Sequence, residues 1–139
     1  MANKRLFVDA NILLELLLPG RTKTKQCERY LMQFNGLVVI SILSVHIAYY
    51  YGKKAGYKIS QIDAFLTDFE IAGASRTEYE LALKITTDTD FEDALQVAVA
   101  KSAGCTMFMT ADKKLAHNYK DEFTFALIAT NDDAFNTSE

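Results

Sequence analysis

Acidic side chains follow two apolar runs of the sequence and open a third segment. Asp9 ends the run in "RLFVDAN", and Asp112 follows "MFMT". Asp90 and Asp93 begin the segment "DFEDALQVAVAKSAG" and share one helical face, because they are three residues apart. Carboxylates within about 4 to 6 Å raise one another's pKa and cannot all stay ionised without a cation. If the fold gathers them, they suit a hard divalent metal, Mg²⁺ or Mn²⁺.

A divalent metal held by these acids would activate water and neutralise charge on a phosphodiester. Two further polar residues follow Asp9 along the chain and are candidates for the same site. Asn11, in the first helical turn, would orient a ligand or a water. Glu15 lies four residues further on the same face and would be close enough to join. Structural alternatives remain open: Asn11 or Asp90 could each be simply a helix N-cap, and Asp93 could merely complement the helix dipole.

Short apolar runs alternate with longer helical segments, which predicts an α/β fold in layers. The expected strands are 5–8, 37–40, 69–72, 105–109 and 125–128, and their apolar content is typical of parallel strands buried on both faces. The expected helices are 11–18, 22–35, 42–55, 60–68, 77–85 and 90–104, with one more between the last two strands. Thr77 and Glu80 are expected to form a capping box. We expect a single domain over residues 1–139, a three-layer α/β/α sandwich with a short parallel sheet.

The strand order determines whether the acids meet. Functional groups of parallel sheets gather beyond the carboxyl ends of the strands, where the strand order reverses. In the order 3-2-1-4-5 the first and fourth strands are neighbours, so that Asp9 and Asp112 face each other. The helix from Asp90 runs antiparallel to the fourth strand and begins at the same edge. Three separate segments then deliver carboxylates to one end of the sheet.

Composition limits the classes of partner. The chain has 139 residues, half of them hydrophobic, with a net charge of −3. It therefore carries no general basic field for nucleic acid or membranes, and an anionic partner needs a local basic patch or a metal. Candidate phosphate contacts are Lys53, Lys54, Lys113 and Lys114, with a solvated surface as the alternative.

The cellular location is predicted from apolar runs and cysteines. No run approaches the roughly 20 apolar residues of a membrane span, so we expect no membrane association. Cys27 and Cys105 have no metal-ligand spacing around them and are interpreted as reduced thiols of a cytoplasmic protein.

Three segments, "FVDANILLELL", "DFEDALQVAVAKSAG" and "MFMTADKKL", in this order and at these separations, resemble the PIN domain, the fold of VapC-type toxin ribonucleases. The resemblance covers essentially the whole chain and implies a metal-dependent endoribonuclease acting on RNA. It implies that Asp9, Asp93 and Asp112 are the catalytic acids and metal ligands, with Asp90 as a further ligand beside Asp93. Thr110 stands where the family often has Ser or Thr near the metal. The same analogy implies a homodimer and a small antitoxin that covers the site.

One position departs from the family pattern. Many PIN domains carry a glutamate in the helix after the second strand, and the corresponding place here holds His46, in "SVHIAYYYG". An imidazole can ligate a metal but adds no negative charge, so we expect weaker Mg²⁺ binding unless Glu15, Asp90 or Glu92 compensates.

Two interpretations from other classes remain. The domain could be catalytically degenerate and bind RNA or a protein partner without cleavage, as His46 and the acidic pI would allow. A receiver-type phosphoacceptor or a haloacid-dehalogenase-like phosphatase would also place an aspartate after the first strand. The receiver needs an acidic pair there, and the phosphatase needs Asp-x-Asp. Neither pattern is present, because the chain has Asp9-x-Asn11.

Overall fold

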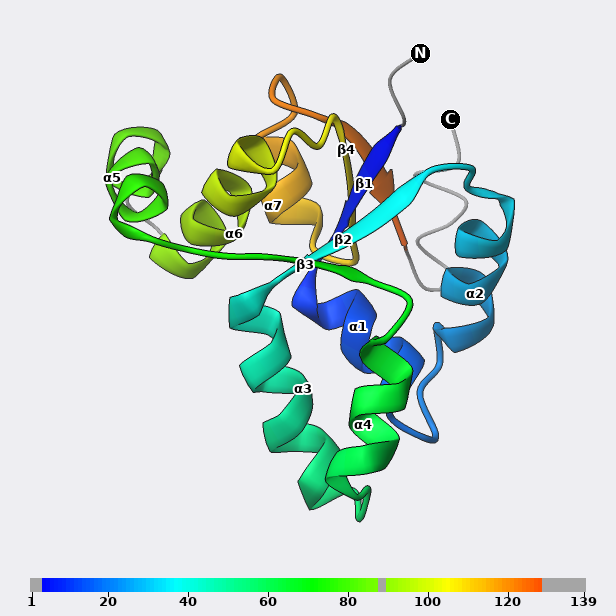
Figure 1. Cartoon of the computed structure of the whole chain (residues 1–139). Helices are drawn as coiled ribbons and strands as arrows, with labels where there is room; N and C mark the ends of the chain where they lie inside the picture. Colours follow the sequence, from blue (N-terminus) through cyan, green and yellow to red (C-terminus); the bar gives the residue numbers. More distant parts are fainter. Residues whose placement is uncertain (1–3, 88–89, 129–139) are drawn as a thin grey trace.

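The computed structural model describes residues 4–87 and 90–128. Within them, five parallel strands form one sheet in the order β3-β2-β1-β4-β5, which confirms the predicted α/β fold and strand order (Figure 1). The strands are β1 (Arg5–Val8), β2 (Leu37–Ser41), β3 (Glu70–Ala72), β4 (Met107–Thr110) and β5 (Thr124–Leu127).

Helices connect every pair of consecutive strands, as the alternation in the sequence predicts. They are α1 (Ala10–Leu17), α2 (Thr24–Gln33), α3 (Ile42–Lys54), α4 (Ile59–Leu66), α5 (Arg76–Ile85), α6 (Phe91–Ser102) and α7 (Lys113–Asn118). Among the described residues, no helix combines the length and the apolar character that a membrane crossing requires.

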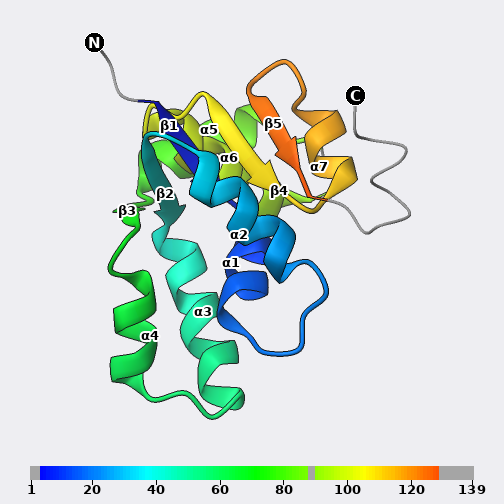
Figure 2. The same ribbon diagram turned by 90° about the vertical axis from the view of Figure 1, so that its right-hand side faces the viewer.

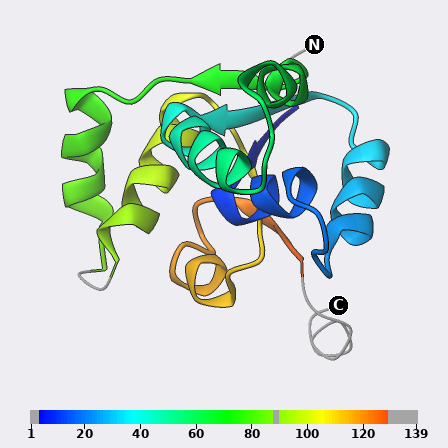
Figure 3. The ribbon, with the colours of Figure 1, turned by 90° about the horizontal axis from the view of Figure 1, so that it is seen from below.

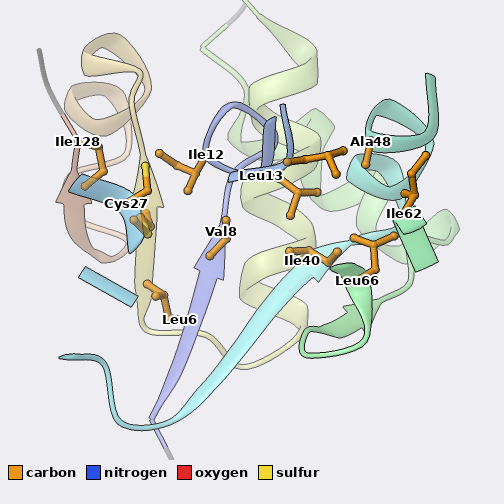
Figure 4. Close-up of a cluster of buried hydrophobic side chains, with 12 residues drawn as sticks. Leu6, Val8, Ile12, Leu13, Cys27, Ile40, Ala48, Ile62, Leu66 and Ile128 are labelled. Atoms are coloured by element: carbon orange, nitrogen blue, oxygen red, sulfur yellow. The ribbon is translucent and has the colours of Figure 1, made fainter. Parts of the chain in front are cut away.

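Alternating side chains of the central strands divide the core into two layers. Leu6 and Val8 pack in one buried cluster with residues of α1, α2, α3 and α4, part of which is drawn in Figure 4. Phe7, between them in β1, points to the opposite face and packs with residues of α6 and α7. In Figure 2, α2 lies in front of the sheet, and α5 and α6 lie behind it.

Helix α5 packs on α6 and lies outside it, away from the sheet (Figure 3). The contact consists of small side chains, since Ala82 of α5 is buried against Ala94 and Ala98 of α6. Small residues allow the two helices to approach closely. Helix α6 is thereby held between the sheet and α5, which keeps its N-terminal turn in place.

The start of α5 corrects one prediction. The capping box is formed by Ser75 and Glu78 and not by Thr77 and Glu80. The Ser75 amide donates a 2.7 Å hydrogen bond to Glu78 Oε1, and the Thr77 amide donates to Ser75 Oγ. The segment "SRTEYE" contains both Ser75-x-x-Glu78 and Thr77-x-x-Glu80, so the spacing rule fits two registers, and the structure adopts the earlier one.

Both cysteines are free and buried. Cys27 belongs to the core layer around α1, and Cys105 belongs to the layer on the other face of the sheet. Burial raises the pKa of each thiol to about 11, which keeps both protonated at neutral pH. Their free state agrees with the prediction that both are reduced thiols.

Candidate active site

The ends of β1 and β4 lie side by side. Val8 is paired with Met109 in the sheet, and the Asp9 amide donates a 2.9 Å hydrogen bond to the Met109 carbonyl. The chain leaves both strands at the same edge, which places Asp9 next to Thr110. This is the juxtaposition that the predicted strand order requires.

The Asp9 carboxylate lies in a polar network at this edge. Asp9 is 7% exposed, and Thr110 is fully buried. Thr110 Oγ1 donates a 2.7 Å hydrogen bond to Asp9 Oδ2, and Asn11 Nδ2 donates to the same oxygen at 3.2 Å. The Ala10 amide donates to Asp9 Oδ1 at 2.8 Å, so Asp9 is the N-cap of α1.

Asn11 is therefore not the N-cap of α1, which was the structural alternative for this residue. It lies inside α1, one position after Ala10. Its Oδ1 accepts a 3.2 Å hydrogen bond from the Ala111 amide, while its Nδ2 donates to Asp9. Asn11 thus joins the start of α1 to the turn after β4 and holds the Asp9 carboxylate in place.

The environment of Asp9 disfavours its ionised form relative to a free aspartate when no cation is near. Burial, the largest effect, raises the pKa of the Asp9 carboxyl, while hydrogen bonds from Thr110, Ala10 and Asn11 lower it. The nearby charge of Asp112 raises it further. A cation beside Asp9 would reverse this preference, because an opposite charge favours the ionised carboxylate.

Asp112 begins α7 just beyond β4. Its Oδ1 accepts hydrogen bonds from the amides of Lys114 (2.9 Å) and Leu115 (3.1 Å), so it is the N-cap of this helix. Its own amide donates a 3.0 Å hydrogen bond to Thr110 Oγ1. The Thr110 hydroxyl consequently connects the two acids, since it accepts from the Asp112 amide and donates to Asp9.

The third acidic segment is the first turn of α6. Asp90 is its N-cap and accepts from the amides of Glu92 and Asp93, as the structural alternative for Asp90 predicted. The pKa of Asp93 is raised to about 7, first by burial and then by the charges of Asp90, Asp112, Asp9 and Glu92. The charges of Asp9 and Asp112, at the ends of the two central strands, therefore act on Asp93.

A cleft of about 420 Å³ opens beside these acids. It is bounded by the start of α1, the first turns of α6, the residue after β4 and the N-terminal half of α3. Its lining residues are Asp9, Ala10, Asn11, Leu43, His46, Ile47, Glu92, Asp93, Leu95, Gln96 and Asp112. The predicted residues Asp9, Asn11, Asp93 and Asp112 meet here, and His46 lines the same cleft.

Gln96 is a residue of this cleft that the sequence-based prediction missed. It is 7% exposed, and its Nε2 donates a 3.0 Å hydrogen bond to the buried Ser44 Oγ of α3. Within the described part of the chain, its Oε1 has no hydrogen-bond partner. A signal was present in the sequence, since Gln96 is a polar residue three positions after Asp93 in the otherwise apolar run "ALQVAVA".

Glu15 does not join the site, which corrects that prediction. Its side chain is buried, but it is bound by the segment between α1 and α2. Glu15 Oε2 forms a 3.0 Å ion pair with Arg21, and Oε1 accepts a 2.8 Å hydrogen bond from the Lys23 amide. The carboxylate therefore serves to hold this connection and does not line the cleft.

The predicted lysines fall into two groups. Lys113 and Lys114 form the first turn of α7, directly after Asp112. Lys53 and Lys54 form the last turn of α3, and Lys54 lies about 12 Å along the helix axis from His46. Lys54 Nζ lies 5.1 Å from the centre of the Tyr50 ring. The first pair thus follows the cleft residue Asp112 in the chain without lining the cleft itself, and the second pair lies at the far end of α3.

The donor set agrees with a hard cation in its chemistry. The acids of the cleft offer oxygen atoms, and their mutual repulsion, which adds to burial in raising the pKa of Asp93, would be relieved by a divalent ion. Over residues 4–87 and 90–128, no three His, Cys, Asp or Glu side chains stand close enough together to hold an ion. The side chains would have to turn toward the ion on binding, so the donor types fit while the ligand geometry is not preformed.

Comparison with known proteins gives the family. The model of the PIN domain family matches residues 6–121. A search of curated proteins by sequence found no match.

Solved structures share the fold at low sequence identity. A toxin-antitoxin complex from Klebsiella pneumoniae is 20% identical over 80% of this chain and 89% of that chain, with a TM-score of 0.69. VapC20 from Mycobacterium tuberculosis, described as a sarcin-ricin loop cleaving toxin, is 17% identical over 81% of this chain and 93% of that chain, with a TM-score of 0.64. VapBC2 from Rickettsia felis, bound to a DNA fragment from its promoter, is 17% identical over 89% of this chain and 98% of that chain, with a TM-score of 0.65.

The family match runs from residue 6, within β1, to residue 121, just beyond α7, and so covers β1 to β4 and all three acidic segments. Together with the strand order and the cleft at the ends of β1 and β4, it identifies the chain as a member of the PIN domain family.

Proposed function

We propose that the protein is a metal-dependent endoribonuclease that hydrolyses RNA phosphodiester bonds with Mg²⁺ or Mn²⁺. The observation that carries this proposal is the gathering of acids from three segments at one cleft, where burial and then the charges of the neighbouring acids raise the pKa of Asp93 to about 7. Structural ion pairs do not account for this arrangement, because the groups that act on Asp93 are all acids. Family membership supports the same chemistry.

Each residue of the cleft has a distinct part in the proposed reaction. Asp9, Asp93 and Asp112 would hold the ion, with Asp90 as a further candidate at the start of α6. When bound, the ion would activate water and neutralise charge on the phosphodiester. Thr110 fixes one oxygen of Asp9 by its 2.7 Å hydrogen bond, so that the carboxylate keeps one orientation.

Substrate binding would use the borders of the cleft. Lys113 and Lys114 begin α7 beside Asp112 and would attract the phosphates that flank the cleaved bond. His46 lines the cleft from α3, where many relatives carry a glutamate, so we propose weaker Mg²⁺ binding than in a four-acid site. Lys53 and Lys54 would contact only RNA that extends to the far end of α3.

We further propose that this nuclease is the toxin of a type II toxin-antitoxin pair in the cytoplasm. The structure from Klebsiella pneumoniae that shares the fold is a toxin-antitoxin complex, and the one from Rickettsia felis is VapBC2 bound to promoter DNA. A small antitoxin protein would cover the cleft, and the nuclease would form a homodimer. Co-expression with the product of a neighbouring small gene, followed by a cleavage assay of the complex, would test this partner.

RNA cleavage by three proteins tests the proposed activity. Wild type, Asp9→Asn and Asp112→Asn would be incubated with single-stranded and structured RNA in Mn²⁺. Asparagine is as good an N-cap as aspartate, so both variants should keep the helix starts while losing a ligand charge. We expect cleavage by the wild type alone. Cleavage by both variants at the wild-type rate would overturn the mechanism. Glu80→Gln, on the exposed surface of α5, is the matched control and should cleave like the wild type.

The second candidate function is RNA or partner binding without cleavage. It is favoured by His46 in the cleft and by the absence of a preformed three-ligand group within the described residues. A wild type that binds RNA in a shift assay but leaves it intact in Mn²⁺ would establish this alternative. The same RNA and metal concentrations should be used as in the cleavage assay.

A further inference from the structure

Gln96 stands out among the polar residues of the cleft because half of its amide is unsatisfied. The residue is 7% exposed and lines the cleft with Asp9, Asp93 and Asp112. Its Nε2 donates to Ser44 Oγ at 3.0 Å, whereas its Oε1 has no hydrogen-bond partner among the residues that the structure describes. Buried amide oxygens are seldom left without a partner, so this one indicates a missing group.

The position of Gln96 on α6 connects it to the acids. It lies three residues after Asp93, and residues at this spacing are neighbours on one helical face. Metal sites in helical proteins use the same i, i+3 arrangement to present two ligands to one ion. The surrounding acids, which raise the pKa of Asp93, are groups that repel one another until a cation is present.

We infer that Gln96 supplies a neutral amide oxygen to the same divalent cation that Asp93 binds. This inference rests on the proposed metal-dependent function and adds a ligand to it. Amide oxygens are regular ligands of hard cations. The hydrogen bond from Nε2 to Ser44 holds the other end of the amide and so fixes the direction of its oxygen.

The assignment has a consequence for the strength of the site. A glutamine gives the ion one more oxygen atom without a further negative charge. The chain, with His46 on the α3 side of the cleft, would then hold its cation with a larger share of neutral ligands than a four-acid site has. The affinity for the cation should therefore not fall when a negative charge is added at position 96.

Isothermal titration of Mn²⁺ into the metal-free protein tests this inference without any measurement of cleavage. Gln96→Met keeps the length of the side chain and removes the amide oxygen, and it should weaken Mn²⁺ binding by about tenfold or more. Gln96→Leu also removes the amide oxygen, and it should weaken Mn²⁺ binding to a similar extent. Gln96→Glu keeps an oxygen and adds a charge, and it should bind Mn²⁺ at least as tightly as the wild type.

Ser44→Ala is the matched control for a purely structural role. It removes the hydrogen bond that orients the amide but leaves the Gln96 oxygen, so it should weaken Mn²⁺ binding less than Gln96→Met does. Equal affinities of Gln96→Met and wild type would overturn the inference alone. Equal weakening by Ser44→Ala and Gln96→Met would also overturn it, because packing would then explain both. A wild type that binds no Mn²⁺ would overturn the proposed function together with this inference.

Discussion

The Thr110 hydroxyl donates a 2.7 Å hydrogen bond to Asp9 Oδ2, which joins the ends of two neighbouring parallel strands through buried side chains. The two residues are 101 positions apart in the chain. Their contact exists because β1 and β4 are adjacent in the sheet. It lowers the pKa of the Asp9 carboxyl against the larger effect of burial, and so helps to keep a ligand charge available.

Replacing Thr110 by Val should therefore weaken the site without unfolding the protein. The substitution keeps the shape and removes the hydroxyl, so the pKa of Asp9 should rise further and Mn²⁺ affinity should fall by about tenfold or more. Thr110→Ser should retain near wild-type affinity. Titration of Mn²⁺ into both variants measures this, and equal binding by Thr110→Val and wild type would contradict the role of the hydroxyl.

The stability of the metal-free protein should depend on pH through Asp93. Its pKa is raised to about 7 in the folded state, so the folded protein binds this proton more tightly than the unfolded chain does. The contribution of Asp93 to stability is fully present below the ordinary aspartate pKa near 4 and is lost as the pH rises through about 7. Urea unfolding in chelator at pH 5.5 and pH 8 should show lower stability at pH 8.

Asp93→Asn provides the control for this pH effect. It removes the titrating group, so the difference in unfolding free energy between pH 5.5 and pH 8 should become smaller. A difference as large as in the wild type would mean that another group is responsible. In the wild type, Mn²⁺ binding at pH 6.5 should also release protons, which titrations in buffers of different ionisation enthalpy would detect.

Glu15 should matter for stability and not for metal binding. Glu15→Ala leaves the Lys23 amide and the Arg21 guanidinium without their acceptor, and it should lower the free energy of unfolding by about 1 to 3 kcal/mol. Arg76→Ala, which removes an exposed pair with Glu80, should cost less than about 0.5 kcal/mol. Urea unfolding of both variants checks this. A loss of Mn²⁺ affinity in a folded Glu15→Ala protein would show that Glu15 contributes to metal binding.

Gly52 should resist substitution although it lies within a helix. Alanine normally stabilises a helix by about 1 kcal/mol relative to glycine. At this position a Cβ would lie 2.7 Å from Ile62 Cδ1 of the fully buried Ile62 side chain, so Gly52→Ala should instead destabilise the α3–α4 contact by about 1 to 3 kcal/mol. Adding Ile62→Val, which removes that methyl group, should make the alanine less costly. Additive effects in a double-mutant cycle would contradict a direct clash.

Much of the fold could be predicted because local patterns and topology agree. The apolar runs marked all five strands, and the order 3-2-1-4-5 placed Asp9 and Asp112 at neighbouring strand ends, as the structure has them. Helix ends were less certain, because two overlapping capping boxes fit the start of α5. A spacing rule alone cannot choose between two registers when both provide the same hydrogen bonds.

The site could be predicted only where residues follow strands or start helices. Asn11 and Glu15 share a helical face by spacing, yet Glu15 is bound by Arg21 beyond the turn at Pro19, a partner that depends on the path of a loop. The pair of Gln96 and Ser44 joins α6 to α3 across 52 residues. Such contacts depend on how two helices pack over the sheet, which local sequence does not specify.

The central claim is that acids from three segments bind one divalent cation that RNA cleavage requires. The most direct test is titration of Mn²⁺ into wild type and Asp9→Asn, followed by addition of single-stranded RNA to the same samples. The account predicts saturable Mn²⁺ binding and RNA cleavage by the wild type, with both lost in Asp9→Asn. A wild type that binds no Mn²⁺ and cuts no RNA, or an Asp9→Asn variant that still does both, would contradict it.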